Sequence, residues 1–145
     1  MRTHHSVVIA RPCAEVFAFV TDLRNEVRWQ PQIKAVELDG PLGAGAHFRE
    51  LRVSFGRRFD WTFVITAFEA PHRIEIETVV GAFPYRGARI FEDLGDSTRV
   101  TEVGELELPR TLRWAEGLLA RLSRIPLRIA YARLQDLLEL DPSCL

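Results

Sequence analysis

The sequence predicts an α+β fold in which an antiparallel sheet is covered by one long C-terminal helix. Three observations predict it. A short apolar run opens the chain, six further runs of strand length occupy residues 33 to 107 with short turns between them, and helical spacing of apolar residues begins near residue 112. Short connections favour antiparallel hairpins. The sheet must cover its apolar face, and only the last helix is long enough to do so.

The composition is typical of one globular domain over residues 1–145. Of the 145 residues, 47% are hydrophobic and 27% are charged, and the net charge is -1. Such a chain buries a core without a disulfide or a metal, and its charge argues against a nucleic-acid binder. Cys13 and Cys144 do not suggest a disulfide framework. No signal-peptide pattern and no run of about 18 apolar residues is present, so we expect a cytoplasmic protein.

The first elements are a strand and two short helices. Residues 6–10 form an apolar run of strand length. Pro12 suits the first position of a helix, because its missing N–H group costs nothing there. The spacing of the apolar residues then predicts a helix over residues 12–20 with Phe17 facing inward, and a second brief helix that ends before Pro31.

Beyond Pro31 the apolar period changes to two, which predicts strands. A glycine-rich turn over residues 39–45 is followed by a strand and not by a helix, so it lacks the helix dipole of a phosphate-binding loop. Glycine and proline turns separate the remaining runs. The six strands are expected at residues 33–38, 46–54, 59–69, 72–80, 85–94 and 97–107.

The inner face of the second of these strands has two interpretations. Leu51 and Val53 share one face, and they match the aromatic face of the next strand only if the loop at Gly56 has an odd number of residues. Phe48 is out of phase with them. Either Phe48 lies on the outer face and His47 and Arg49 share the inner face with Leu51 and Val53, or a bulge near Arg49 and Glu50 turns Phe48 and Glu50 inward.

The C-terminal third is predicted to be one long helix, bent at Pro126 and about 45 Å long, because a proline removes a backbone hydrogen bond. The apolar residues that we expect to face the core before the bend are Leu112, Ala115, Leu118, Leu119, Leu122 and Ile125. A stripe of arginines lies roughly opposite this face and consists of Arg110, Arg113, Arg121, Arg124 and Arg128.

Five segments carry a family resemblance: Val8 to Phe17, Asp22 to Asn25 with Trp29 and Pro31, the turn Gly43 to Phe48, Ala70 to Ile74, and Ser97 to Thr101. They resemble the START-like (SRPBCC) superfamily and, within it, the bacterial polyketide cyclase/dehydrase and lipid-transport group. The resemblance covers nearly the whole chain. It implies a helix-grip (Bet v 1-like) fold, in which a curved antiparallel sheet wraps around the C-terminal helix and encloses a hydrophobic cavity, with two short helices after the first strand.

Such a cavity would bind a small hydrophobic molecule, such as a lipid or a polyketide-like ring system, and no cofactor is implied. Any single aromatic residue could instead fill the core. The residues that we predict to contact the ligand are Phe17, Trp29, Phe48, Trp61, Phe63, Phe83, Tyr85, Leu118 and Leu122. Apolar burial alone would give weak to micromolar affinity, so a few polar groups must provide selectivity.

A second hypothesis makes the chain a polyketide cyclase or dehydratase. That chemistry needs a general acid or base beside the bound poly-ketone and a donor that stabilises the enolate. The candidates are Glu50, His47, Tyr85 and Arg89, from a wider polar set that also holds Arg49, Arg52 and Asp60. The structural alternative is that strand alternation places most of these side chains on the surface.

Metal and covalent catalysis are disfavoured. His4 and His5 point to opposite faces of a strand, and no nucleophile-elbow or zinc-protease motif is present. A third hypothesis uses the arginine stripe, with Trp114 beside it, to contact an anionic membrane or an acidic partner. We favour the plainer interpretation of that stripe as the solvated back of an amphipathic helix.

Overall fold

The computed structural model describes residues 1–140, so that Cys144 lies outside the described residues. One antiparallel sheet has the strand order β1-β7-β6-β5-β4-β3-β2. The first strand therefore pairs with the last, and the other strands follow one another as the predicted meander. The strands are β1 (Arg2–Ile9), β2 (Ile33–Asp39), β3 (His47–Ser54), β4 (Arg57–Glu69), β5 (Arg73–Val80), β6 (Tyr85–Asp93) and β7 (Thr98–Leu106).

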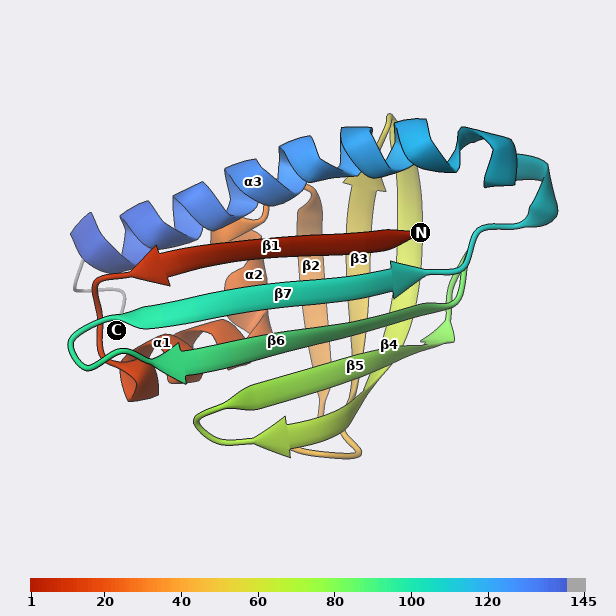
Figure 1. The fold of residues 1–145 in the computed structure, drawn as a ribbon. Helices are drawn as coiled ribbons and strands as arrows, with labels where there is room; N and C mark the ends of the chain where they lie inside the picture. The colour runs from red at the N-terminus through yellow and green to blue at the C-terminus, as the bar shows by residue number, and fades with distance from the viewer. Residues whose placement is uncertain (141–145) are drawn as a thin grey trace.

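The helices lie on the concave side of this curved sheet (Figure 1). The long helix α3 runs beside β1, while α1 and α2 lie beneath its C-terminal half. The prediction of a helix-grip fold is confirmed by this arrangement. No helix in residues 1–140 is long and apolar enough to cross a bilayer. The helical elements are α1 (Cys13–Thr21), η1 (Leu23–Asn25), α2 (Glu26–Trp29), η2 (Arg110–Ala115) and α3 (Glu116–Leu140), with η marking 3-10 turns.

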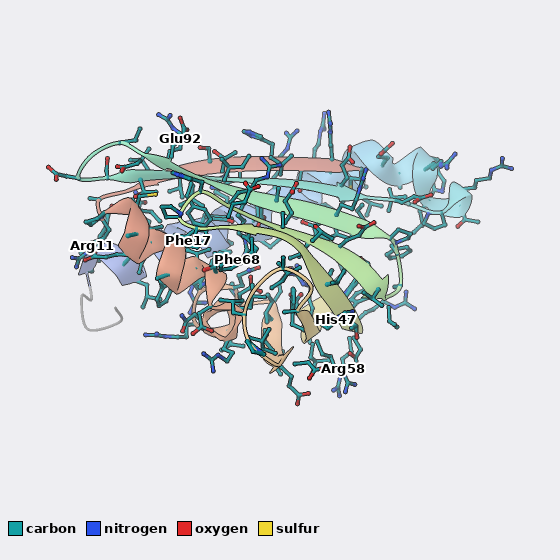
Figure 2. The ribbon with its side chains drawn as sticks, turned by 90° about the horizontal axis from the view of Figure 1, so that it is seen from below. Arg11, Phe17, His47, Arg58, Phe68 and Glu92 are labelled. Carbon is teal, nitrogen blue, oxygen red and sulfur yellow. The ribbon has the colours of Figure 1, made fainter. Side chains whose placement is uncertain are left out.

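The core gathers where α1, the sheet and the second half of α3 meet. Phe17 of α1 packs edge-on against Phe91 and Phe68, with ring centroids 5.1 and 5.4 Å apart. Figure 2 shows Phe17 and Phe68 side by side under the sheet. A register shift between Ile65 and Ala67 turns Phe68 toward this core. The prediction that Phe17 faces inward is confirmed.

The expected face of the last helix is partly wrong before Pro126, because Leu112, Ala115 and Leu119 are half-buried as expected but the other three predicted residues are exposed. The helix continues through Pro126 as predicted, but Leu118, Leu122 and Ile125 are 59%, 37% and 55% exposed. Its buried residues all come after the proline and are Ala130, Tyr131, Leu134 and Leu138. The helix is seated about a quarter turn away from the predicted orientation.

The β3–β4 hairpin corrects the predicted register. Its loop has two residues, Phe55 and Gly56, which both have positive φ angles, 52° and 73°. Positive φ angles at both loop residues are typical of the type I′ hairpin turn, whose twist matches that of the strands. The loop is therefore even in length, and no bulge interrupts the pairing of Glu50 with Trp61. As a result Phe48 and Glu50 face inward, because the whole strand is phased opposite to the expectation for Leu51 and Val53.

Candidate ligand-binding cavity

A cavity of about 480 Å³ lies between the sheet and the first half of α3. Its volume falls within the range of small-molecule sites. Strands β3 to β7, the helix α2 and the facing side of α3 supply the walls. The side chains that line it include Glu26, Glu50, Arg52, Phe55, Phe59, Trp61, Phe63, Ile74, Ile76, Phe83, Tyr85, Arg89, Glu102, Leu106, Leu108, Leu112, Leu119, Ser123, Leu127 and Ala130.

Aromatic rings form one wall of the cavity. Trp61 and Phe63 alternate along β4 and are stacked with an interplanar angle of 8° and centroids 5.7 Å apart. Tyr85 of β6 meets Phe63 edge-on at 6.2 Å, and Phe59 continues the row on the other side of Trp61. Because alternate residues of a strand point the same way, one strand can present this continuous apolar surface. It can bury a flat ring system or an alkyl chain.

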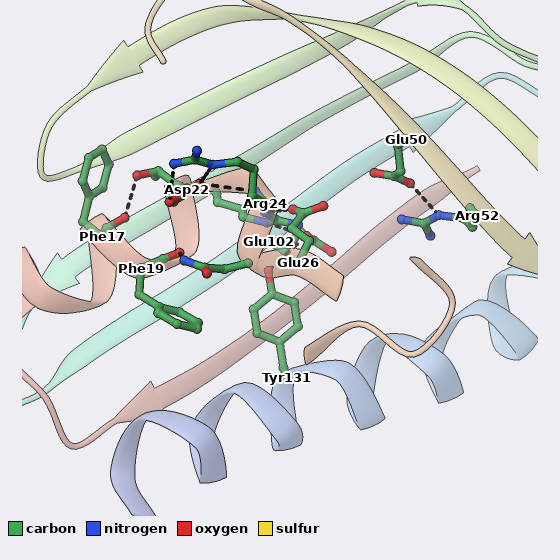
Figure 3. A network of polar contacts seen from close by, with 12 residues as sticks. Phe17, Phe19, Asp22, Arg24, Glu26, Glu50, Arg52, Glu102 and Tyr131 are labelled. Carbon is green, nitrogen blue, oxygen red and sulfur yellow. Dashed lines mark hydrogen bonds and ion pairs between the residues drawn. The ribbon is translucent and has the colours of Figure 1, made fainter. Parts of the chain in front are cut away.

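The inner end of the cavity is polar, and its centre is Arg89 of β6. The guanidinium donates through Nε to Glu102 at 2.9 Å and through Nη1 to Glu26 at 2.5 Å, with only 13% of the Arg89 side chain exposed. Tyr131 of α3 donates its hydroxyl to the same Glu102 oxygen at 3.0 Å (Figure 3). This network joins α2, the sheet and α3. It holds Arg89 in a single orientation, with its carbon Cζ 5.2 Å from the Trp29 ring centroid.

Burial governs protonation in this network. It raises the pKa of Glu26 above its ordinary value, although the nearby Arg89 charge acts in the opposite direction. Burial and the Glu102 charge also raise the pKa of Tyr131. Burial and the Arg89 charge thus oppose each other at Glu26, which pairs with Arg89, while the Tyr131 phenol keeps the proton that it donates to Glu102.

A second buried pair stands on β3, apart from the first (Figure 3). Arg52 donates through Nε to Glu50 at 2.8 Å. The Glu50 side chain is 5% exposed and that of Arg52 is 33% exposed. The two residues are two apart on the strand, so both side chains point toward the cavity. Because a guanidinium has five N–H donors and this bond uses only one, Arg52 can donate further hydrogen bonds to a ligand.

The phenol ring of Tyr85 lies over a part of the sheet where two glycines leave no side chains. Gly87 and Gly104 are paired across β6 and β7, and a Cβ atom at either would lie 2.8 or 2.5 Å from the Tyr85 hydroxyl oxygen. These two glycines therefore make room for the phenol. Burial, with the nearby Glu102 charge, raises the pKa of Tyr85, so the hydroxyl stays protonated and can donate to a ligand oxygen.

The structure brings six of the predicted site residues together and separates six others from the cavity. Those that line it are Glu50, Tyr85, Arg89, Trp61, Phe63 and Phe83. His47 is exposed at the start of β3, on the outer side of the sheet (Figure 2). Leu118 and Leu122 lie on the solvent side of α3, whereas Phe17, Trp29 and Phe48 are buried in the core.

The other polar candidates divide by strand face. Arg52 lines the cavity, but Arg49 and Asp60 form an ion pair on the outer face of β3 and β4. Sequence reasoning missed Glu26, Glu102 and Tyr131. A signal existed for two of them, because Glu102 shares a face with Val100 in β7, and Tyr131 recurs with Leu134 and Leu138 at helical spacing. Within residues 1–140, no three His, Cys, Asp or Glu side chains converge as metal ligands.

Comparison with solved structures shows what this architecture is similar to. A protein of Thermus thermophilus superposes with a TM-score of 0.82 at 19% identity, covering 94% of this chain and 95% of the other. The Zhui aromatase/cyclase of Streptomyces sp. R1128 superposes with a TM-score of 0.73 at 14% identity, covering 95% of each chain. A START superfamily protein of Mycobacterium smegmatis gives 0.65 at 18% identity, covering 90% and 98%. At such low identities, these superpositions show a shared fold and nothing more.

The family of the chain is identified by comparing its sequence with models of protein families. No curated protein is similar enough to count as a match. The family model described as "Polyketide cyclase / dehydrase and lipid transport" matches residues 1–139, which is nearly the whole chain. Together with the seven-stranded sheet, the long C-terminal helix and the START superfamily neighbour, this match agrees with the resemblance found in the sequence. The chain belongs to the polyketide cyclase/dehydrase and lipid transport family.

Proposed function

We propose that the chain is a cytoplasmic protein that binds a small hydrophobic ligand, a lipid or a polyketide-like ring system, in the cavity between the sheet and α3. The observation that carries this proposal is a cavity of about 480 Å³ with an aromatic wall and a polar inner end. Burying about 300 Å² of ligand surface contributes roughly 7 kcal/mol before the costs of association. That range corresponds to weak or micromolar binding, which polar contacts then sharpen.

The polar end favours a ligand that carries neutral oxygens. Its charges already pair with one another, Arg89 with Glu26 and Glu102, and Arg52 with Glu50. A ligand carboxylate would have to enter beside three carboxyl groups without a free cation of its own. Hydroxyl or ketone oxygens can instead accept hydrogen bonds from Arg52 and Tyr85 without disturbing the ion pairs. A neutral sterol-like, fatty-alcohol or polyphenolic compound meets these requirements.

Native mass spectrometry and thermal shift test the proposal. Protein purified from its own host should carry an apolar molecule. When added to the empty protein, neutral alcohols and polyphenols should raise the melting temperature more than acids of matched size do. Ser123→Trp places an indole on the cavity side of α3 and should abolish the shift. Ala132→Trp, on the exposed side of the same helix, should leave it intact. Equal shifts in both variants would contradict binding in this cavity.

The second candidate function is a polyketide cyclase or dehydratase. The observation that favours it is the convergence of Glu50, Tyr85 and Arg89 inside the cavity. Glu50 would remove a proton from the carbon between two ketones, and Tyr85 would donate a hydrogen bond to the enolate oxygen. Arg89 is already bonded to two carboxylates, so it serves as a positioning residue.

A synthetic poly-ketone thioester tests this second function. Cyclisation followed by loss of water should produce an aromatic absorbance when the protein is present. Glu50→Gln should lower kcat by at least about 100-fold, since general-base catalysis contributes that much. Arg49→Gln, on the opposite face of the same strand, should retain full turnover. Binding without any turnover in the wild-type protein would leave only the ligand-binding function.

A further inference from the structure

The outer side of α3 carries a row of exposed apolar residues that the cavity does not use. Trp114 is 83% exposed, Leu118 59%, Ile125 55% and Ile129 49%, and Leu122 lies between them at 37%. The four residues of α3 are spaced three or four apart, which places them along one line of the helix over about three turns, and Trp114 lies in the preceding 3-10 turn η2. These five residues are named here the outer row. Nothing else in residues 1–140 covers them.

Arginines border the outer row on one side. At ~100° per residue, Arg121, Arg124 and Arg128 occupy the sector next to Leu118 and Ile125, not the sector opposite the apolar residues. All three are exposed, and none forms an ion pair with an acidic side chain among residues 1–140. The outer side of α3 thus combines an apolar half with a basic edge. This combination is typical of helices that lie in the surface of an anionic membrane.

We propose that the outer row and its arginines dock α3 onto an anionic lipid bilayer surface. The apolar side chains would enter the boundary between headgroups and acyl chains, while the guanidinium groups contact lipid phosphates and carboxylates. Trp114 suits this depth, because an indole ring prefers the membrane interface. Its N–H already donates to the Thr111 carbonyl at 2.8 Å, so burying the ring leaves no polar group unpaired.

Charge decides between a bilayer and a second copy of the chain as the occupant. Residues 117–135 contain four arginines and no acidic residue. Two copies packed through the outer row would bring their arginines together without any carboxylate from this stretch to offset the repulsion. An anionic bilayer supplies the missing negative charge over the whole surface. The charge of α3 therefore complements an anionic lipid surface better than it complements a second copy of the same helix.

The proposed membrane-binding surface and the cavity lie on opposite sides of α3. Leu119, Ser123 and Leu127 line the cavity from the same turns of α3 whose outer side carries Leu118, Ile125 and the arginines. A bilayer bound there would touch the helix that closes the cavity. This inference goes beyond the proposed ligand binding and does not depend on it, because the outer row and the cavity have different residues.

Vesicle co-sedimentation tests the docking. Wild-type protein should bind vesicles of phosphatidylcholine with phosphatidylserine and release at high salt, and it should bind pure phosphatidylcholine far less. Each arginine contributes about a five-fold gain in partitioning, so Arg121→Gln/Arg124→Gln/Arg128→Gln should weaken binding roughly 100-fold. Ile125→Gln/Ile129→Gln should also weaken it. A control variant with the same net charge as the arginine triple, Arg58→Gln/Arg86→Gln/Arg99→Gln, alters strands β4, β6 and β7 and should bind nearly as well as the wild type.

The outcomes separate docking from ligand binding and from self-association. Equal binding by the two arginine triples, or binding independent of phosphatidylserine, would overturn the proposal. So would a dimer in analytical ultracentrifugation that Ile125→Gln/Ile129→Gln dissociates, because a second copy would then cover the outer row. The urea unfolding midpoint of each variant serves as the folding control. It should stay close to that of the wild type in every variant, whether or not the vesicles bind.

Discussion

At the scale of single residues, the Glu50–Arg52 pair places a buried charge in the cavity wall. Its carboxylate is almost fully buried, so Arg52→Met leaves a charge without its partner. We expect a loss of about 2 kcal/mol in the free energy of unfolding, less than for a fully dry pair because one third of the Arg52 side chain is exposed. Glu50→Gln/Arg52→Met should recover most of this loss, since no unpaired charge remains. Urea unfolding of the three proteins measures both effects.

The same strand supplies the control for this prediction. Arg49 pairs with Asp60 on the outer face of β3 and β4, where both side chains are about half exposed. Water already solvates these charges, so Arg49→Gln should change the unfolding midpoint little or not at all. A double variant as unstable as Arg52→Met alone would show that the loss comes from side-chain packing and not from the unpaired carboxylate.

At the scale of elements, the β3–β4 turn combines strain with function. Phe55 has a φ of 52°, which costs about 1 kcal/mol for a side chain of this kind, yet it lines the cavity mouth and is 65% exposed. Asparagine tolerates this conformation. Phe55→Asn should therefore raise the free energy of unfolding by about 0.5 to 1 kcal/mol while weakening the binding of an apolar ligand. Chemical unfolding and ligand titration on the same variant measure the two opposite effects.

Gly56 provides the matched change in the same turn. Its φ is 73° and a Cβ there would meet no neighbour, so Gly56→Ala should lower stability by about 1 kcal/mol through the backbone alone. Ligand affinity should stay unchanged, because Phe55 remains in place. A loss of affinity equal to that of Phe55→Asn would indicate that the shape of the turn matters, and not its aromatic ring.

This turn also explains which elements the sequence predicts well. Glycine and proline mark the turns, so the bounds of β2 to β7 lie close to the expected ranges, whereas β1 has no such mark and begins earlier, at Arg2. The face of β3 depends instead on the parity of one loop. Phe55 is not typical of the first position of such a turn, where asparagine or aspartate is common, so the pattern favours an odd loop centred on Gly56 instead. One residue of difference turned every side chain of β3 to the other face.

At the scale of the whole molecule, the orientation of α3 could not be predicted from its sequence. Before Pro126 apolar residues cover more than one side of the helix, from Leu119 on the cavity side to Ile125 on the outer side. Several rotations of the helix are therefore compatible with the pattern. Contacts far apart in the sequence select one of them, such as the hydrogen bond from Tyr131 to Glu102. For the same reason the sequence cannot show that Arg89 meets Glu26, Glu102 and Tyr131, which come from elements far apart in the chain.

Tyr131 of the network around Arg89 and Tyr85 beside it make the free energy of unfolding depend on pH in the alkaline range. Burial raises the pKa of Tyr85 and of Tyr131, so the folded protein keeps two protons that the unfolded chain releases near pH 10. The native state then binds more protons than the unfolded state, and the free energy of unfolding falls as the pH rises above about 10. Each tyrosine contributes roughly 1.4 kcal/mol per pH unit to this decline.

Tyr131→Phe isolates one of the two contributions. At pH 8 the variant should be about 1 kcal/mol less stable than the wild type, because the hydroxyl no longer donates to Glu102. Above about pH 10 its stability should fall less steeply, since one proton fewer is linked to unfolding, so the gap should narrow by roughly 1.4 kcal/mol per pH unit. Urea unfolding at closely spaced pH values measures this slope. Parallel curves for the two proteins would mean that the Tyr131 phenol titrates alike in the folded and unfolded states, and that the cavity end is wetter than its burial indicates.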